Sequence, residues 1–161
     1  MRKTVELGFF LALALILSYV ESLIPFSFGI PGIKLGLPNL IVLLLLYRDG
    51  ARQAALVNFL RILLSGFLFG SLYGILYALA GAVFSFGAMS AGKRAQCFSA
   101  VGVSVLGGVF HNIGQILVAM MVVETFAVGY YLPFLIVAGT VSGAVLGIVA
   151  TELMPYLEHA I

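Results

Sequence analysis

Long apolar runs, separated by short polar breaks, dominate this chain. Most of the runs have no polar face, which distinguishes them from the one-sided helices of soluble proteins. Six of them are predicted to be helices, at about 5–24, 38–47, 51–68, 71–89, 98–123 and 130–153. The pattern predicts an all-α integral membrane protein: a single domain over 1–161, folded as a compact bundle of six transmembrane helices.

The second segment is shorter than the others. It begins at Pro38, which suits the first turn of a helix, and its run to Tyr47 covers about half of the roughly 20 residues needed to span a bilayer. Either part of the preceding loop extends this helix, or the helix lies partly inside the bundle. Merging 38–68 into one span would bury Arg48 and Arg52 in the membrane, so two helices are favoured.

Composition and charge agree with this prediction. Of the 161 residues, 63% are hydrophobic and 9% are charged, and the mean hydropathy is +1.21. With the N-terminus in the cytoplasm, six of the eight basic residues lie on the cytoplasmic side, Lys34 lies outside and Arg61 lies within the membrane. We therefore expect both termini to lie in the cytoplasm. The protein is expected to be a multi-pass protein of the bacterial inner, or cytoplasmic, membrane. The net charge of +2 then reflects topology, and no nucleic acid is expected as a partner.

The first apolar run is similar to a signal peptide in its basic start. No clear cleavage site follows it, so we expect it to remain as the first helix.

Motifs for catalysis are missing from the sequence. It holds no P-loop, no G-x-S-x-G and no H-E-x-x-H, and no Cys/His grouping has metal-ligand spacing. Cys97 is the only cysteine, and Asp49 is the only aspartate, so the aspartate-rich magnesium clusters of prenyl-diphosphate synthases cannot be assembled. We expect no enzymatic activity, no metal and no cofactor.

A few polar residues lie near the middle of the apolar segments, where a charge costs about 2.5–3.5 kcal/mol on insertion scales. Arg61 shares one helical face with Asn58 and Ser65, and could pair with Glu21 or backbone carbonyls, or bind a carboxylate or phosphate. The polar residues of the fifth segment could equally join helices or contact a ligand. The candidate substrate-binding residues are Lys34, Asn39, Asn58, Arg61, His111, Asn112 and Gln115.

The segment 25–38 combines prolines and glycines with apolar residues, which is unusual for a loop in water. We expect it either to pack as a re-entrant segment or to close over a pocket, with Lys34 and Asn39 supplying polar contacts.

Small residues recur every three or four positions on three segments, and packing inside the bundle is favoured over docking of another subunit. The positions are Gly8 and Ala12, then Gly74, Ala78, Gly81 and Ser85, then Gly139, Gly143 and Gly147.

Three stretches together resemble the heptaprenyl diphosphate synthase component I family, also called Gx transporter, over nearly the whole chain. They are Gly32-Ile-Lys-Leu-Gly-Leu-Pro-Asn39, Asn58-Phe-Leu-Arg61 and His111-Asn-Ile-Gly-Gln115. That family resembles the substrate-binding S components of energy-coupling-factor (ECF) transporters, six-helix bundles with cytoplasmic termini whose first outer loop closes over a vitamin or metabolite. The resemblance implies a gating position for Lys34 and Asn39.

The same resemblance implies a docking surface at Gly8 and Ala12 for a transmembrane T component, with ABC ATPases as further partners. The usual pattern there is Ala-x-x-x-Ala, from which this sequence departs at Gly8.

Three functions remain open at this point. The first is a substrate-binding membrane subunit of an ECF-type importer, surrounded by lipid, for a small anionic or isoprenoid-related metabolite. The second is a membrane accessory subunit of a polyprenyl (heptaprenyl) diphosphate synthase. The third is a structural subunit of a larger membrane complex, in which the buried polar residues only join helices.

Overall fold

The computed structural model describes residues 2–24 and 36–159, and the regular structure within these ranges is entirely helical. The elements are α1 (Arg2–Leu23), α2 (Leu37–Arg48), α3 (Ala51–Phe69), α4 (Leu72–Ala95), α5 (Ala100–Val123), the 3₁₀ helix η1 (Phe126–Tyr131) and α6 (Leu132–His159). The predicted all-α fold with six α-helices is confirmed for this part of the chain. The largest differences from the predicted bounds are at the ends of α4 and α6, which continue several residues beyond their apolar runs.

Among the described residues, five helical segments are long and apolar enough to cross a membrane, and α2 is a shorter apolar helix. Large hydrophobic side chains lie exposed on the outside of the long helices, as on Phe67, Val83 and Val137. A surface of this kind suits contact with lipid rather than water. The chain is therefore a multi-pass membrane protein.

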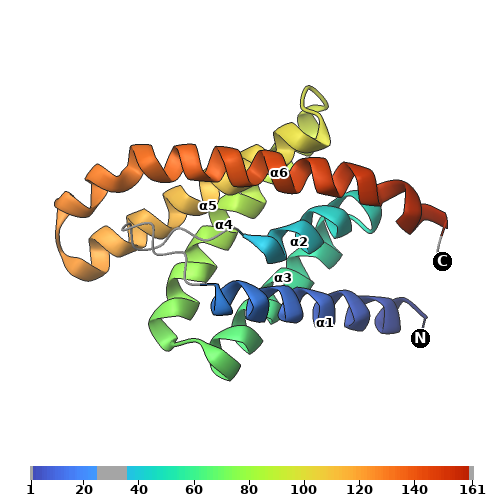
Figure 1. The fold of residues 1–161 in the computed structure, drawn as a ribbon, viewed down its shortest axis with the longest axis horizontal. Helices are drawn as coiled ribbons and strands as arrows, with labels where there is room; N and C mark the ends of the chain where they lie inside the picture. The colour runs from blue at the N-terminus through green and yellow to red at the C-terminus, as the bar shows by residue number, and fades with distance from the viewer. Residues whose placement is uncertain (1, 25–35, 160–161) are drawn as a thin grey trace.

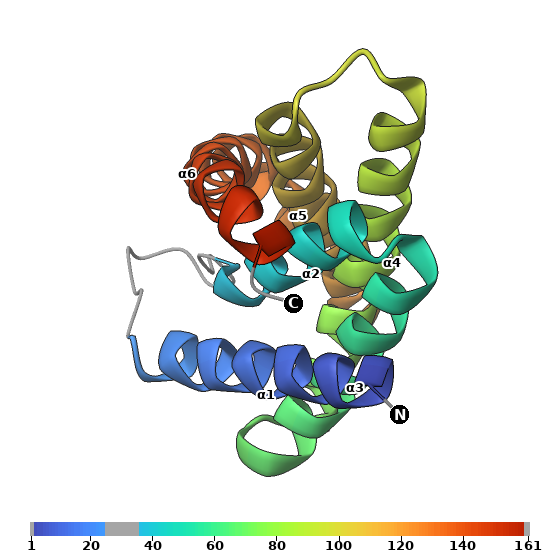
Figure 2. The ribbon, with the colours of Figure 1, turned by 90° about the vertical axis from the view of Figure 1, so that its right-hand side faces the viewer.

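The long helices follow one another around the bundle in the order α6, α5, α4, α3 and α1, each in contact with the next (Figure 1). The short helix α2 lies between α1 on one side and α6 on the other, and also contacts α3 (Figure 2). The N- and C-terminal ends lie at the same end of the bundle (Figure 1).

Helix α2 is enclosed by the rest of the protein. Its six consecutive residues from Ile41 to Leu46 are each at most 5% exposed, so no side of the helix is open. It begins directly after Gly36, which has a left-handed φ of 73°, and Pro38 lies in its first turn. The short length of α2 left open whether it lies inside the bundle, and the structure shows that it does.

Glycines bring α5 and α6 into close backbone contact. A Cβ placed on Gly139 would lie 2.7 Å from the carbonyl oxygen of Gly108, and one on Gly143 would lie 2.8 Å from that of Ser104. Real Cβ atoms do not approach this closely, so both positions need glycine at the present helix separation. The predicted stripe that includes Gly139 and Gly143 thus packs within the bundle.

Polar contacts gather at the end of the bundle where α1 begins and α2 and α4 end. Arg48 Nη2 lies 3.3 Å from Glu6 Oε2, and the guanidinium lies over the ring of Phe10, 5.3 Å from its centroid. Lys93 Nζ donates to the carbonyl oxygen of Leu46. This end, called the basic end below, joins α1, α2 and α4.

Candidate functional site

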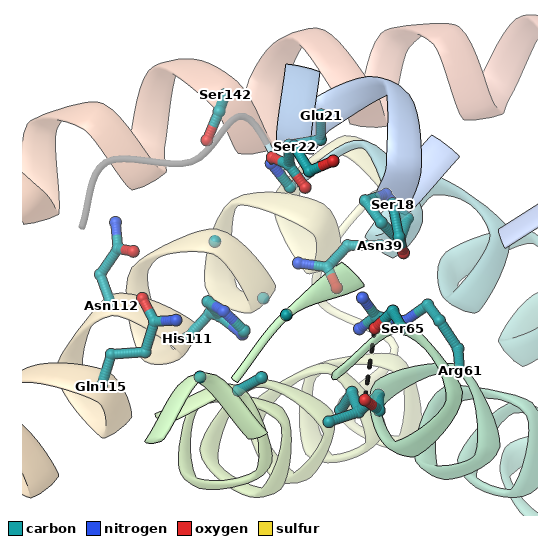
Figure 3. Close-up of a pocket in the computed structure, with 18 of the residues that line it drawn as sticks. Ser18, Glu21, Ser22, Asn39, Arg61, Ser65, His111, Asn112, Gln115 and Ser142 are labelled. Atoms are coloured by element: carbon teal, nitrogen blue, oxygen red, sulfur yellow. Dashed lines mark hydrogen bonds between the residues drawn. The ribbon is translucent and has the colours of Figure 1, made fainter. Parts of the chain in front are cut away.

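A cavity of about 200 Å³ lies between the helices, toward the end of the bundle opposite the basic end (Figure 3). Each of α1 to α6 contributes to its lining. Its polar lining residues are Ser18, Glu21, Ser22, Asn39, Arg61, Ser65, Ser71, Ser104, His111, Asn112, Gln115 and Ser142. Most of the polar residues that the sequence places within apolar segments therefore meet in one space.

Glycines line this space on two sides. Gly66, Gly70 and Gly74 lie where α3 turns into α4, and Gly107 and Gly108 lie on α5. A Cβ on Gly66 would lie 2.0 Å from Ile75 Cγ1, and one on Gly108 would lie 2.3 Å from the Gly139 carbonyl oxygen. These glycines therefore allow the helices around the cavity to pack closely.

Arg61 is the buried charge of the cavity. It is 8% exposed, and its Nη2 donates to Asn58 Oδ1 at 2.6 Å, one turn earlier on α3. Its Nε is also buried and has no hydrogen-bond partner among the described residues. A buried donor without an acceptor is costly, so the described protein groups satisfy this guanidinium only in part.

Asn58 lies behind Arg61 rather than in the lining of the cavity. Because its amide oxygen accepts the guanidinium hydrogen bond, it orients Arg61 from within the same helix. Ser65, on the same face, lines the cavity and donates to the carbonyl oxygen of Ile62 at 3.2 Å.

The N-terminus of α2 forms part of the cavity wall. Its cap, Gly36, has no side chain to accept from the first turn, and the backbone N–H of Gly36 donates to Glu21 Oε1 at the end of α1. Asn39, in the first turn of α2, also lines the cavity. The amide groups at a helix start carry a partial positive charge, which here faces the same space as the guanidinium.

The polar residues in the middle of α5 either bond to α6 or line the cavity, and Asn112 does both. Asn112 Nδ2 donates to the carbonyl oxygen of Leu135 at 2.7 Å, so this side chain joins α5 to α6 while lining the cavity. His111 and Gln115 line the cavity opposite Gly81 of α4. A Cβ on Gly81 would lie 2.7 Å from His111 Cε1, so this glycine sets where the imidazole lies.

The structure brings together six of the residues singled out in the sequence: Glu21, Asn39, Arg61, His111, Asn112 and Gln115. Lys34 lies outside the described residues. Their roles in binding a ligand remain a prediction. Within the described ranges, no three His, Cys, Asp or Glu side chains lie together as a metal site would need.

Gly8 and Ala12 lie on the outer face of α1, away from the cavity. Both are exposed, and a Cβ on Gly8 would meet nothing within 4 Å. The opposite face of α1 is buried at Phe10 and Ala14. The first helix thus packs on one side only.

Three serines that were not predicted to belong to a site also line the cavity: Ser22, Ser104 and Ser142. Serine in an apolar helix is also a common packing residue, so its presence alone could not separate the two roles. The position of Ser142 next to Gly143, where α6 approaches α5 closely, was the one available signal.

Apolar helices around an enclosed short helix, with a polar cavity inside, define a multi-pass membrane protein with an internal polar site. The family model described as heptaprenyl diphosphate synthase component I matches residues 10–153, so the chain belongs to this family, as its motifs predicted. Comparisons with curated proteins and with solved structures find no match.

Proposed function

We propose that this protein is the substrate-binding membrane subunit of an ECF-type importer and holds a small anionic metabolite in the cavity. The observation that carries this proposal is Arg61, a buried guanidinium that lines the cavity and has an Nε without a partner among the described residues. Burial of a charge is tolerated where it faces a functional cavity, and a guanidinium matches carboxylate and phosphate oxygens.

Size and surroundings support the same ligand class. A cavity of about 200 Å³ suits a small metabolite or the polar head of a larger one. His111, Asn39 and Gln115 add hydrogen-bonding groups to the lining of the cavity, while Ile62, Ile75 and Leu146 supply apolar walls. These groups favour recognition of an anion with a small apolar part, and we retain the prediction that the chain has no catalytic activity.

The position of the cavity fits capture from outside. If the basic end faces the cytoplasm, as the distribution of Lys and Arg favours, the cavity lies toward the outer half of the membrane. The exposed face at Gly8 and Ala12 is then available to a T component, and the ATPases would act from the cytoplasm.

A second candidate function rests on the family to which the chain belongs. Its description names a component of heptaprenyl diphosphate synthase, so this chain could be the membrane accessory subunit of such an enzyme. In that case Arg61 would hold a diphosphate for an aspartate-rich partner instead of for transport.

Replacement of one arginine tests the anion-binding role. The Arg61→Ala variant should weaken binding of an anionic ligand by about 2–5 kcal/mol, the loss expected when one partner of a buried charge pair is truncated. Binding is measured by thermal stabilisation of the purified protein in detergent against carboxylates, phosphate esters and isoprenoid diphosphates. The matched control is Arg52→Ala, an exposed arginine on the same helix. Unchanged affinity in a folded Arg61→Ala protein would refute this role.

Partners separate the two functions. A pull-down of the tagged chain from its native membranes should recover two ABC-type ATPases and a T-like membrane subunit. Recovery of a prenyl synthase without ATPases would replace the importer proposal with the accessory one.

A further inference from the structure

We propose that Glu21 is a resident anion of the cavity, which the anionic group of the ligand displaces from the N-terminus of α2. This inference rests on the proposed function and specifies it: the ligand carries a carboxylate or phosphate group, and that group takes the position of the Glu21 carboxylate at the N-terminus of α2, in the cavity that Arg61 also lines. Binding would then release the end of α1 from the start of α2.

The first support is the surroundings of the α2 N-terminus. The helix has 12 residues, enough for a substantial dipole, and its cap, Gly36, supplies no side-chain acceptor. Beyond its first turn the helix is enclosed by the bundle, so the rest of α2 is shielded from water. Such a helix start attracts an anion with oxygen acceptors.

The second support is independent of the helix. Arg61 is more than nine-tenths buried, lines the same cavity, and has an Nε without a hydrogen-bond partner among the described residues. Its Nη2 donates to Asn58, which does not line the cavity. A guanidinium has five N–H donors, so Arg61 retains donor capacity for a further acceptor.

The third support is the group that occupies the α2 N-terminus at present. Glu21 comes from α1, accepts the Gly36 N–H, and is the one carboxylate among the described residues that line the cavity. It brings negative charge to a site whose other charged group is Arg61. A ligand anion entering beside it would be repelled, because a second negative charge near a carboxylate is disfavoured.

Competition between two anions has a consequence for specificity. A ligand with an acidic group can replace the attraction that Glu21 loses when it leaves Gly36 and Arg61. A neutral ligand of the same shape cannot, so it would have to bind beside an intact Glu21 contact. The site would therefore select anions even though its own net charge is close to zero.

The experiment compares Glu21→Gln with the unchanged protein, using inorganic diphosphate and inorganic phosphate as probes and thermal stabilisation in detergent as the readout. The variant keeps the shape of the side chain and removes its charge. It should bind the probes about tenfold more tightly, because the competing charge is gone. Glu124→Gln, at an exposed position at the end of α5, is the matched control and should leave affinity unchanged. Glu21→Ala repeats the test should the amide form a new bond.

The outcomes separate the two proposals. Tighter binding in Glu21→Gln and Glu21→Ala, lost again when Arg61→Ala is added, supports displacement. Equal or weaker binding in both Glu21 variants, with binding still dependent on Arg61, overturns the displacement of Glu21 and leaves the proposed function standing. If the unchanged protein binds neither probe nor any other anion, both proposals are overturned.

Discussion

The two halves of the bundle use the same helices in opposite ways. Toward the basic end, α1 and α3 pack against α2 with apolar residues such as Phe10, Ala14 and Val57, all nearly fully buried. Toward the other end, the same two helices present Glu21 and Arg61 to a cavity. Each helix changes from apolar packing residues to polar cavity residues within about one turn. Ser18 follows Ala14 by four residues, and Arg61 follows Val57 by four residues.

The difference shows which half holds the fold together. In a membrane, helix association depends on close packing and hydrogen bonds, because lipid chains are as apolar as leucine. The half around α2 maximises packing, whereas the cavity half gives up contacts and buries polar groups. We therefore expect substitutions that disturb close packing to change stability, and substitutions of the polar residues that line the cavity to change binding more than stability.

The largest loss of stability is expected where backbone meets backbone, on the α5–α6 wall that spans both halves. In Gly139→Ala the new Cβ would lie 2.7 Å from the Gly108 carbonyl oxygen, and backbone cannot rotate aside. The helices must separate, at a cost of about 3 kcal/mol, the upper part of the range for overpacking. Unfolding in mixed detergent micelles measures it. The control is Gly87→Ala on α4, where a Cβ meets nothing within 4 Å; equal stability of both variants would contradict the packing argument.

A smaller loss is expected inside the α2 half. Leu45 is fully buried, so Leu45→Ala leaves a void that the surrounding helices fill only in part. The expected cost is about 2 kcal/mol, at the low end for such truncations because the unfolded side chain would rest in lipid. Anion binding per folded molecule should remain unchanged. A matched truncation of the exposed Leu72 should change neither property, and a selective loss of binding in Leu45→Ala would show that the two halves are coupled.

The smallest loss is expected in the cavity half. Asn112→Ala removes the hydrogen bond to the Leu135 carbonyl oxygen, worth about 1 kcal/mol. Because Asn112 also lines the cavity, its removal should alter affinity for an anionic ligand. Measurement of both quantities on one sample separates the two roles. Lower stability with unchanged affinity would assign Asn112 to helix packing alone, and would weaken the distinction between the halves at this position.

Much of the fold follows from the sequence because lipid imposes a simple rule. Apolar runs of sufficient length must be helical, so the six helices and their order were predictable, as was the family from its three motifs. The short length of the α2 run indicated that this helix is unusual but left two arrangements open. Enclosure by other helices depends on contacts between distant segments, which periodicity along one segment does not reveal.

The site was predictable in its residues more than in its geometry. Arg61 and His111 stood out because charged and polar groups are rare in apolar segments, and both line the cavity. The rotation of a helix about its axis decides which way each side chain faces. A helix that is apolar on all sides does not reveal from its sequence which face points into the bundle. For this reason Asn58, grouped with Arg61 by spacing, proved to lie behind it as a hydrogen-bond acceptor.

The enclosure of α2 also constrains how the protein is made. A 12-residue helix is too short to enter the bilayer as a stable span, and this one has almost no surface left for lipid. Its contacts include α6, which is synthesised after α3, α4 and α5. The enclosure of α2 is therefore complete only once α6 has joined the bundle. A segment that leaves the ribosome early thus reaches its final surroundings late.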